Sequence, residues 1–366
     1  MIDRRLVQNF DWGLLGLTIV LSFIGIMTLY SAVTAGKSVQ DVLFFKQIIW
    51  YIIGFVLMIF SFLFNYKYLD RWAFIIYGVC ILLLVLVLFF GKSAGGSRRW
   101  LILGPVTFQP SEFAKLAVIF VIAKYYSKIV STNGLLMSEL IVPAILCIIP
   151  FSLIVLQPDL GTAMLIILIV ASMSVFVKIE KKAFIFISTT GAIAISTIWF
   201  FLRDYQKKRI ITFLNPEQDP LGAGYHIIQS KIAIGSGMIS GKGFLKGTQS
   251  ALSFLPEQQT DFIFSVFAEE WGFIGCLLLL LVFFMFIARC LKIIYGSRNH
   301  FGAILSFGIT AMLLWHIVVN MGMALGLLPV VGVTLPFISY GGSSIVITLI
   351  SIGILLNISM RRFLFN

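Results

Sequence analysis

The chain has 366 residues, of which 60% are hydrophobic and only 11% are charged, and its formal net charge is +12. An ordinary soluble domain carries about 25% charged residues, so this composition excludes that class. Repeated apolar runs of about 20 residues are each long enough to cross a hydrocarbon core of roughly 30 Å. We therefore predict an all-α integral membrane protein that forms a single polytopic domain over residues 1–366.

Apolar runs between charged residues and Gly/Pro breaks predict ten membrane spans. Their approximate bounds are 13–33, 43–64, 72–90, 111–127, 139–156, 161–177, 183–202, 263–291, 301–326 and 338–360. Lys and Arg in short loops favour the cytoplasmic side, and they concentrate in the loops that share a side with Arg4 and Arg5. Both termini are therefore expected in the cytoplasm, and residues 203–262 are expected to form one large extracytoplasmic loop between spans 7 and 8.

Polar residues gather near the predicted outer end of the fourth span. Arg98 and Arg99 precede Trp100, a sequence typical of interfacial anchoring, with phosphate binding as the rival interpretation. Glu112 and Lys115 are spaced i, i+3 at the start of the span, on one helical face. An ion pair that seats the helix and a functional pair both fit this spacing.

The break between the fifth and sixth spans contains Gln157 and Asp159. Asp159 stands immediately before the apolar run, where a carboxylate can accept from the first backbone amides of a helix. Capping alone could explain this residue, and a functional role is the alternative.

The loop at 203–262 has the composition of a mixed polar site. It holds seven Lys or Arg residues against five Asp or Glu residues, and seven glycines lie between 222 and 247. Glycine permits tight turns and close approach to a ligand. Ile227, Ile228, Ile232 and Ile234 indicate a half-buried interfacial stretch. Long loops are usually functional or disordered, and this composition favours function.

Two carboxylates, Glu257 and Asp261, lie at the mouth of the long eighth span. Ionised side chains at membrane depth cost roughly 2.5–3.5 kcal/mol to insert, so they are usually retained for a function. Asp261 is the first candidate for chemistry, whereas Glu257 fits a structural or orienting role. Of Glu269 and Glu270, deeper in the span, one is expected to face a polar interior. The Pro/Gly-rich break at 328–344 is expected to be shielded by protein or to line a wet cavity.

Three familiar kinds of site are not predicted. The glycines from Gly235 to Gly241 read G-x-G-x-x-x-G with no preceding strand, which is the wrong spacing for a dinucleotide site. His226, His300 and His316 are dispersed, so we expect no zinc site. No S-x-x-K motif occurs, which argues against a penicillin-type transpeptidase centre.

Five motifs follow one another along the chain. They are Gln109-Pro-Ser-Glu112-x-x-Lys115, Gln157-Pro-Asp159-Leu-Gly161, the glycine-bounded stretch 222–237, Leu255-Pro-Glu-x-x-Thr260-Asp261-Phe-Ile-Phe, and Pro336-Phe-Ile-Ser-Tyr-Gly-Gly-Ser-Ser344. Together they resemble the SEDS family, the shape, elongation, division and sporulation proteins of bacteria. Gly247-Thr248-Gln249-Ser250 resembles the RodA branch of that family more than the FtsW division branch.

The resemblance implies a peptidoglycan glycosyltransferase that polymerises lipid II into glycan strands during cell elongation. It implies location in the bacterial cytoplasmic (inner) membrane with the active face extracytoplasmic. The implied partners are lipid II, the growing strand, a class B penicillin-binding protein and other membrane proteins of the elongation complex, and no nucleic acid is expected.

The resemblance also implies roles for particular residues. Asp261 matches the essential acidic residue of the family and would be the general base of an inverting transfer. Candidates for stabilising the leaving pyrophosphate are Lys115, Arg99, Arg209 and Lys231. Supporting polar positions are Glu112, Asp159, Gln157, Gln229, Glu257 and Thr260. A divalent cation, Mg or Mn, could aid departure of the pyrophosphate, although no ligand cluster in the sequence indicates one.

Two other functions compete with polymerisation. A lipid II flippase would also use ten spans and a polar cavity, and inverted repeats would favour it, but we find no convincing internal repeat. A non-catalytic scaffold of the cell-wall elongation complex is the third class. The gathering of charged groups at the outer rim favours surface polymerisation.

Overall fold

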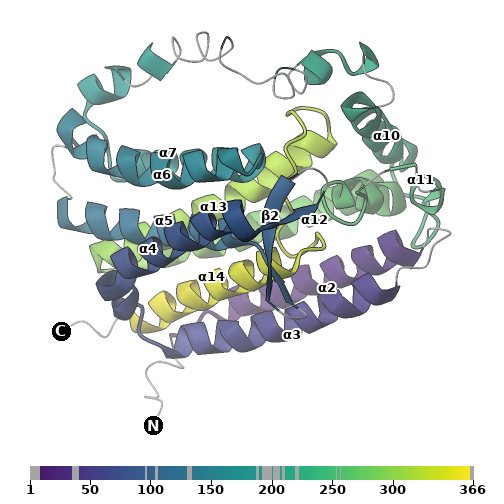
Figure 1. Cartoon of the computed structure of the whole chain (residues 1–366). Helices are drawn as coiled ribbons and strands as arrows, with labels where there is room; N and C mark the ends of the chain where they lie inside the picture. The colour runs from purple at the N-terminus through teal and green to yellow at the C-terminus, as the bar shows by residue number, and fades with distance from the viewer. Residues whose placement is uncertain are drawn as a thin grey trace.

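The computed structural model describes residues 9–34, 41–94, 97–103, 106–129, 134–186, 189–191, 200, 207, 211–218, 222–252, 254–255 and 257–362. Long helices lie side by side in one bundle, and both termini lie at the same end of it (Figure 1). The long helices are α2 (Trp12–Thr34), α3 (Asp41–Leu63), α4 (Lys67–Phe90), α5 (Pro110–Ile129), α6 (Ile141–Leu156), α7 (Leu160–Phe176), α12 (Ile263–Gly296), α13 (His300–Ala324) and α14 (Gly342–Arg361). Shorter elements are α10 (Ala223–Ser236), α11 (Thr248–Ala251) and two 3-10 turns, Met137–Leu140 and Pro216–Gln218.

The predicted mostly helical membrane fold is confirmed. Within the described ranges, seven helices are long and apolar enough to cross a membrane, and α7 is a shorter apolar helix of 17 residues. Nine of the ten predicted spans coincide with a helix, α5 included, whereas most of the predicted span 183–202 lies outside the described residues. The total number of spans therefore stays a prediction.

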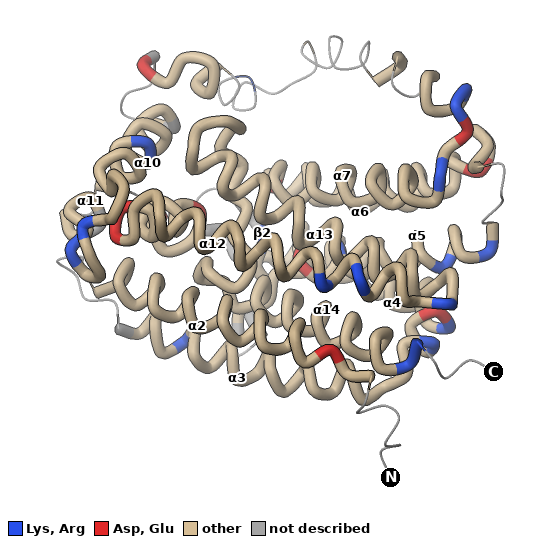
Figure 2. Tube along the Cα trace, turned by 180° about the vertical axis from the view of Figure 1, so that it is seen from behind, with Lys and Arg blue, Asp and Glu red and all other residues tan. Residues whose placement is uncertain are grey.

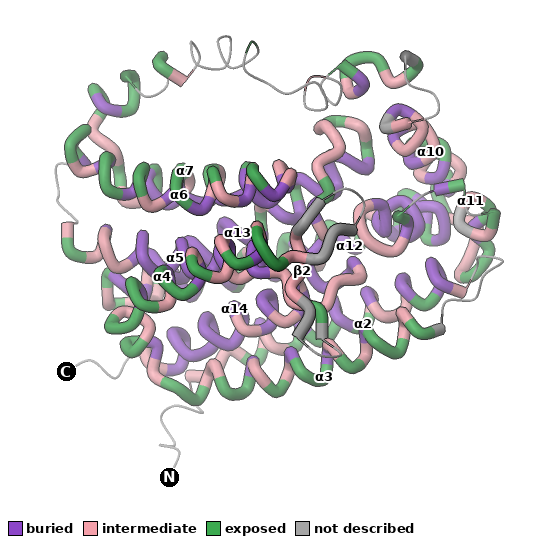
Figure 3. Tube along the Cα trace, in the orientation of Figure 1, coloured by how far each residue is buried: buried purple, intermediate pink, exposed green. Residues whose placement is uncertain are grey.

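Helices α5, α13 and α14 form the interior of the bundle. Their side chains are buried along most of their length, while α2, α3, α4 and α6 keep one face exposed (Figure 3). Large apolar side chains such as Phe23, Phe60 and Phe89 lie on those exposed faces. An apolar surface of this kind suits contact with lipid, since a helix that is hydrophobic all round belongs in a core or a membrane.

A small antiparallel sheet, which the sequence pattern did not predict, follows α4. Its strands are β1 (Lys92–Ala94), β2 (Ser97–Leu103) and β3 (Val106–Phe108), in the order β1-β2-β3. The central strand β2 carries Arg99 and Trp100 to the start of α5. For Arg99 the sequence left interfacial anchoring and phosphate binding open. The sheet places this arginine beside the start of α5.

Helix α12 is broken at Gly272, which has a φ of +62°. The glycine-rich segment 237–249 packs into this break: Phe273 N donates to Met238 O at 2.9 Å, and Lys242 N donates to Glu269 O at 3.1 Å. A Cβ at Gly237 or Gly241 would clash with the carbonyl oxygens of α12. These two glycines therefore serve a close approach between two backbones, and not the approach to a ligand that the sequence suggested.

Two buried carboxylates of α12 hold the same segment. Glu269 Oε1 lies 2.7 Å from Lys242 Nζ and accepts from Thr248 Oγ1 at 3.1 Å. Glu270 Oε1 accepts from Ser31 Oγ of α2 and from Leu245 N. Both acids thus face polar groups inside the protein, whereas the sequence predicted this for one of them.

We expect Gly272→Ala to lower the thermal stability of the purified protein. Gly272 has a ψ of −163°, and alanine in this region of φ and ψ, which is essentially confined to glycine, is strained by about 1–3 kcal/mol. Its Cβ would also clash with Gly241 N and lie 2.8 Å from both Gly237 O and Ile239 O. Gly78→Ala in α4 is the matched control, because nothing lies within 4 Å of a Cβ there. The measurement is the melting temperature in detergent. Equal melting temperatures for the Gly272→Ala and Gly78→Ala proteins would contradict this explanation of the helix break.

Candidate functional site

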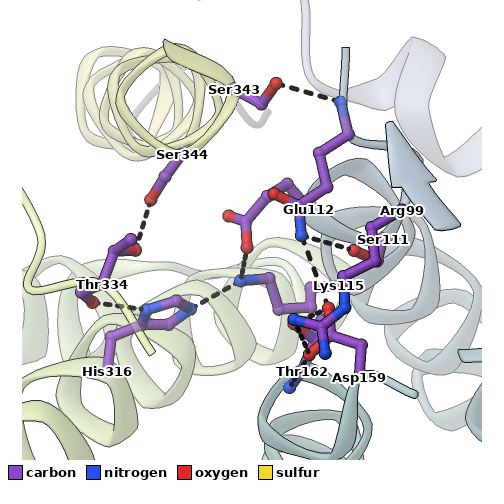
Figure 4. A network of polar contacts seen from close by, with 11 residues as sticks. Arg99, Ser111, Glu112, Lys115, Asp159, Thr162, His316, Thr334, Ser343 and Ser344 are labelled. Carbon is purple, nitrogen blue, oxygen red and sulfur yellow. Dashed lines mark hydrogen bonds and ion pairs between the residues drawn. The ribbon is translucent and has the colours of Figure 1, made fainter. Parts of the chain in front are cut away.

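A cavity of about 440 Å³ opens where α5, α7, β2 and two loops converge. Its lining comes from β2, the starts of α5 and α7, the segment 257–261, His316 of α13, the loop 332–341 and the first turn of α14 (Gly342–Arg361). Figure 4 shows side chains of α5, α7 and β2 on one side and those of α13, α14 and the loop before α14 on the other. Segments more than 200 residues apart in the chain thus form one polar site.

The backbone around Asp261 is fixed from the C-terminal part of the chain. Asn320 Nδ2 donates to Asp261 O at 3.0 Å, and Ser339 Oγ donates to Thr260 O at 2.6 Å. Gly332, at a φ of +74°, brings its backbone so close that a Cβ there would lie 3.3 Å from Asp261 Oδ2. The carboxylate is therefore positioned by α13 and the loop that follows it, and not by α12 alone.

The environment of Asp261 raises the pKa of its carboxyl to about 6. Burial is the largest cause, because it disfavours the charged form, and the nearby negative charge of Glu257 acts in the same direction. Arg99 lowers the pKa, Asp159 raises it, and a hydrogen bond with Thr260 lowers it. A carboxylate with this pKa is ionised at neutral pH and is a stronger base than an ordinary aspartate, which suits general-base chemistry.

Asp159 caps α7 and also faces the cavity. Its Oδ1 accepts from Thr162 N at 3.3 Å, so the predicted cap is present. The same carboxylate lies 3.8 Å from Arg99 Nη1 and accepts from Gln109 Nε2 at 3.4 Å. Arg99 also donates to the carbonyl oxygens of Gln157 and Pro158. The cap is thus joined to a half-buried arginine at the rim of the cavity.

Lys115 lies beneath the cavity in a buried network (Figure 4). Its Nζ is 2.8 Å from Glu112 Oε1 and 2.7 Å from His316 Nε2, and both partners line the cavity. His316 Nδ1 lies 3.0 Å from Thr334 O. The predicted i, i+3 pair is therefore present and extends to α13, so that a positive charge is held behind the wall of the site.

The structure brings six of the predicted site residues to the cavity wall, and the other described ones lie elsewhere. Those on the wall are Arg99, Glu112, Asp159, Glu257, Thr260 and Asp261. Gln157 is buried and ties the break before α7 to Leu84 O of α4 at 2.9 Å. Gln229 and Lys231 lie on α10, and Lys231 is exposed beside Gly326. Arg209 lies outside the described residues.

Several cavity residues were not among the predicted site residues. They are Trp100, Gln109, His316, Thr334, Tyr340, Ser343 and Ser344. Gln109, Tyr340 and the two serines lie within the motifs quoted above, so the motifs could have identified them as site residues. No sequence pattern pointed to His316, because its partner Lys115 is 201 positions away in the sequence.

The part of the chain that the structure describes contains no group of three or more His, Cys, Asp or Glu side chains arranged to hold a metal ion. The chemistry that these residues offer is proton transfer at Asp261 together with cationic stabilisation by Arg99 and Lys115.

Comparison with known proteins gives concordant results. The family described as cell cycle protein, FtsW/RodA/SpoVE, matches residues 10–363. The peptidoglycan glycosyltransferase MrdB of Escherichia coli K12 is 41% identical over 347 residues, which cover 94% of this chain and 93% of that protein. The stage V sporulation protein E of Bacillus subtilis is 37% identical over 356 residues, covering 95% and 96%.

Solved structures agree over almost the whole length. A chain from a study of polymerization and crosslinking by a peptidoglycan synthase complex has a TM-score of 0.84 and 32% identity, covering 97% of this chain and 98% of that one. The rod shape determining protein RodA of Thermus thermophilus has a TM-score of 0.72 and 29% identity with the same coverage. That protein was also solved as a variant with one aspartate replaced by alanine.

Proposed function

This chain belongs to the FtsW/RodA/SpoVE family and is a peptidoglycan glycosyltransferase, and we propose that it polymerises lipid II with Asp261 as general base. The observation that carries the proposal is the cavity in which Asp261, with a pKa raised to about 6, shares one wall with Arg99 and Asp159. Proton acceptor and cation are the two groups that this reaction requires.

In the proposed reaction the 4-hydroxyl of an acceptor GlcNAc attacks C1 of a donor MurNAc. The O4–C1 bond forms, the bond from C1 to the pyrophosphate oxygen breaks, and Asp261 takes the hydroxyl proton. An α-linked donor becomes a β-1,4 bond in one inversion, so no covalent intermediate is needed. Arg99 at the wall and Lys115 behind it stabilise the negative charge that develops on the leaving pyrophosphate.

Location and partners follow from the same proposal. The short-loop cations of the sequence put both termini in the cytoplasm, so the cavity with Asp261 opens at the extracytoplasmic face of the bacterial inner membrane. There it meets lipid II, the growing strand and a class B penicillin-binding protein of the elongation complex. We assign no step to a divalent cation.

The test is polymerisation by the purified chain. Lipid II in detergent, with and without the cognate class B transpeptidase, is expected to give glycan strands that gel electrophoresis resolves. If the chain makes no strands under either condition but moves labelled lipid II across the membrane of liposomes, it is a transporter and not a polymerase. A chain that does neither would be a scaffold.

The acidity of Asp261 predicts the pH profile of the reaction. A general base must be ionised, so kcat/KM is expected to be constant above about pH 6 and to fall tenfold per unit below it. Glu257→Gln removes a charge that raises the pKa of Asp261, so this acid limb should move to lower pH. Arg99→Gln removes a charge that lowers it, so the limb should move to higher pH. Initial rates between about pH 4.5 and 8 measure these shifts. If the fall in kcat/KM occurred at the same pH in all three proteins, Asp261 would not be the general base.

A further inference from the structure

Two adjoining cavities lie at the end of the bundle opposite the candidate site. Their volumes are about 510 and 270 Å³, and they share Gly13, Arg289 and Lys292. Helix α12 begins beside Asp261 and reaches these cavities near its C-terminal end. Helix α2 begins at them and ends near the site, where Gln258 Nε2 donates to Ala32 O at 2.8 Å. The cavities therefore open at the face that the charge pattern assigns to the cytoplasm.

Positive charge dominates the lining of this pair of cavities, which we name the Arg289 pocket. Among the described residues, Arg289, Lys292 and Arg362 line it together with a single acid, Asp11. Asp11 Oδ1 accepts from Leu14 N at 2.9 Å, capping α2, and lies 3.8 Å from Arg289 Nη1. Lys292 is exposed and forms no ion pair with any described residue. The pocket thus keeps positive charge that its own acid does not neutralise, at the end of the bundle where Lys and Arg gather (Figure 2).

The backbone of α2 makes room for the guanidinium of Arg289. A Cβ at Gly13 would lie 2.8 Å from Arg289 Cζ and 3.0 Å from its Nε, so a side chain there would displace the group. Nothing lies within 4 Å of a Cβ at Gly16, one turn further along the same helix. The space at Gly13 is therefore specific to the arginine.

The Arg289 pocket also has apolar lining, and exposed apolar side chains follow it along α2 and α12. Leu17, Met285 and Ala288 line it. Phe284 on α12 and Val20 on α2 are exposed nearby along the same two helices. Trp12, at the start of α2, is 65% exposed, and tryptophan at a helix end is typical of the level of lipid head groups.

We propose that the Arg289 pocket binds the phosphodiester head group of an anionic phospholipid of the cytoplasmic leaflet, with the acyl chains along α2 and α12. A planar guanidinium matches the oxygens of a phosphate, and the ammonium of Lys292 adds a second charge. Basic pockets between membrane helices are recognised sites for such head groups. The pocket is separate from the cavity of Asp261, so this proposal does not depend on the reaction at the other face.

Binding of fluorescent phosphatidylglycerol to the full-length protein in detergent tests the proposal. Saturable binding is expected, much tighter than that of phosphatidylcholine with the same acyl chains and label. Arg289→Gln combined with Lys292→Gln should weaken it roughly thirtyfold. Lys181→Gln combined with Arg298→Gln removes two other cations outside the pocket and should leave the affinity unchanged.

A pair of glycine variants separates loss of the pocket from loss of folding. Gly13→Leu should displace Arg289 and weaken phosphatidylglycerol binding at least about tenfold, whereas Gly16→Leu should not. Both replacements favour helix formation, and gel filtration verifies that both proteins are intact. Equal affinities for the two glycine variants would overturn the proposal. Displacement of the labelled lipid by an equimolar amount of glycerol phosphate would also overturn it, because the pocket would then be a site for a soluble phosphate.

Discussion

Asp261→Asn is expected to lower the rate of lipid II polymerisation roughly a hundredfold to ten-thousandfold, the usual contribution of a general base. Asparagine has the same shape but accepts no proton, and the hydrogen bond that Asn320 Nδ2 donates to the backbone at position 261 is unaffected. The melting temperature should therefore not fall, and the loss should appear in kcat more than in KM. The measurement is the initial rate of strand formation by purified protein.

Glu257→Gln is the matched control for this experiment. Glu257 lines the same cavity and is also a carboxylate, but it is exposed, and its negative charge raises the pKa of Asp261 instead of accepting the proton. This variant should keep most of the activity at neutral pH. If Asp261→Asn polymerised at the wild-type rate, or if both variants were equally inactive, Asp261 would lose its role as the specific base.

Lys115→Met is expected to cause the largest loss of stability, about 3–5 kcal/mol. Removing one partner of a buried ion pair leaves the other charge uncompensated, and Lys115 and Glu112 are only 1% and 7% exposed. Polymerisation should fall as well, because the positive charge behind the cavity wall is lost. Thermal unfolding in detergent and the polymerisation assay measure the two effects separately.

The double variant Glu112→Gln/Lys115→Met distinguishes charge from packing. It removes both charges, so it should recover much of the stability while activity stays low. Lys128→Met, an exposed position on the same helix α5, should change the unfolding free energy by less than about 0.5 kcal/mol. A Lys115→Met protein that melts like Lys128→Met would show that the buried pair contributes little to stability.

Those parts of the molecule that depend on local sequence could be predicted. Hydropathy located the helices, because a span needs a continuous apolar run of fixed length. The Asp159 cap and the Glu112–Lys115 pair were predictable since each links residues three apart on one helix. Asp261 stood out because ionised groups are rare at the edge of a membrane segment.

Those parts that depend on distant contacts could not be predicted. His316 bonds Lys115 across 201 positions, and no spacing rule connects two different helices. The break at Gly272 is invisible to hydropathy, since Trp271 and Phe273 on either side of it are apolar and the run of residues after it stays apolar. The small sheet was missed because β1 and β3 have three residues each, too few for a clear alternating pattern.

The way Asp261 is anchored also bears on when the enzyme first becomes competent during its synthesis. The bonds that orient the 257–261 segment come from residues as late as Tyr340, whose amide donates to Gln259 O at 2.8 Å. Ser344, on the first turn of the final helix, completes the wall. A nascent polypeptide still leaving the ribosome therefore has its aspartate but no organised pocket around it. Premature termination before the final helix would leave a membrane-inserted but inert product.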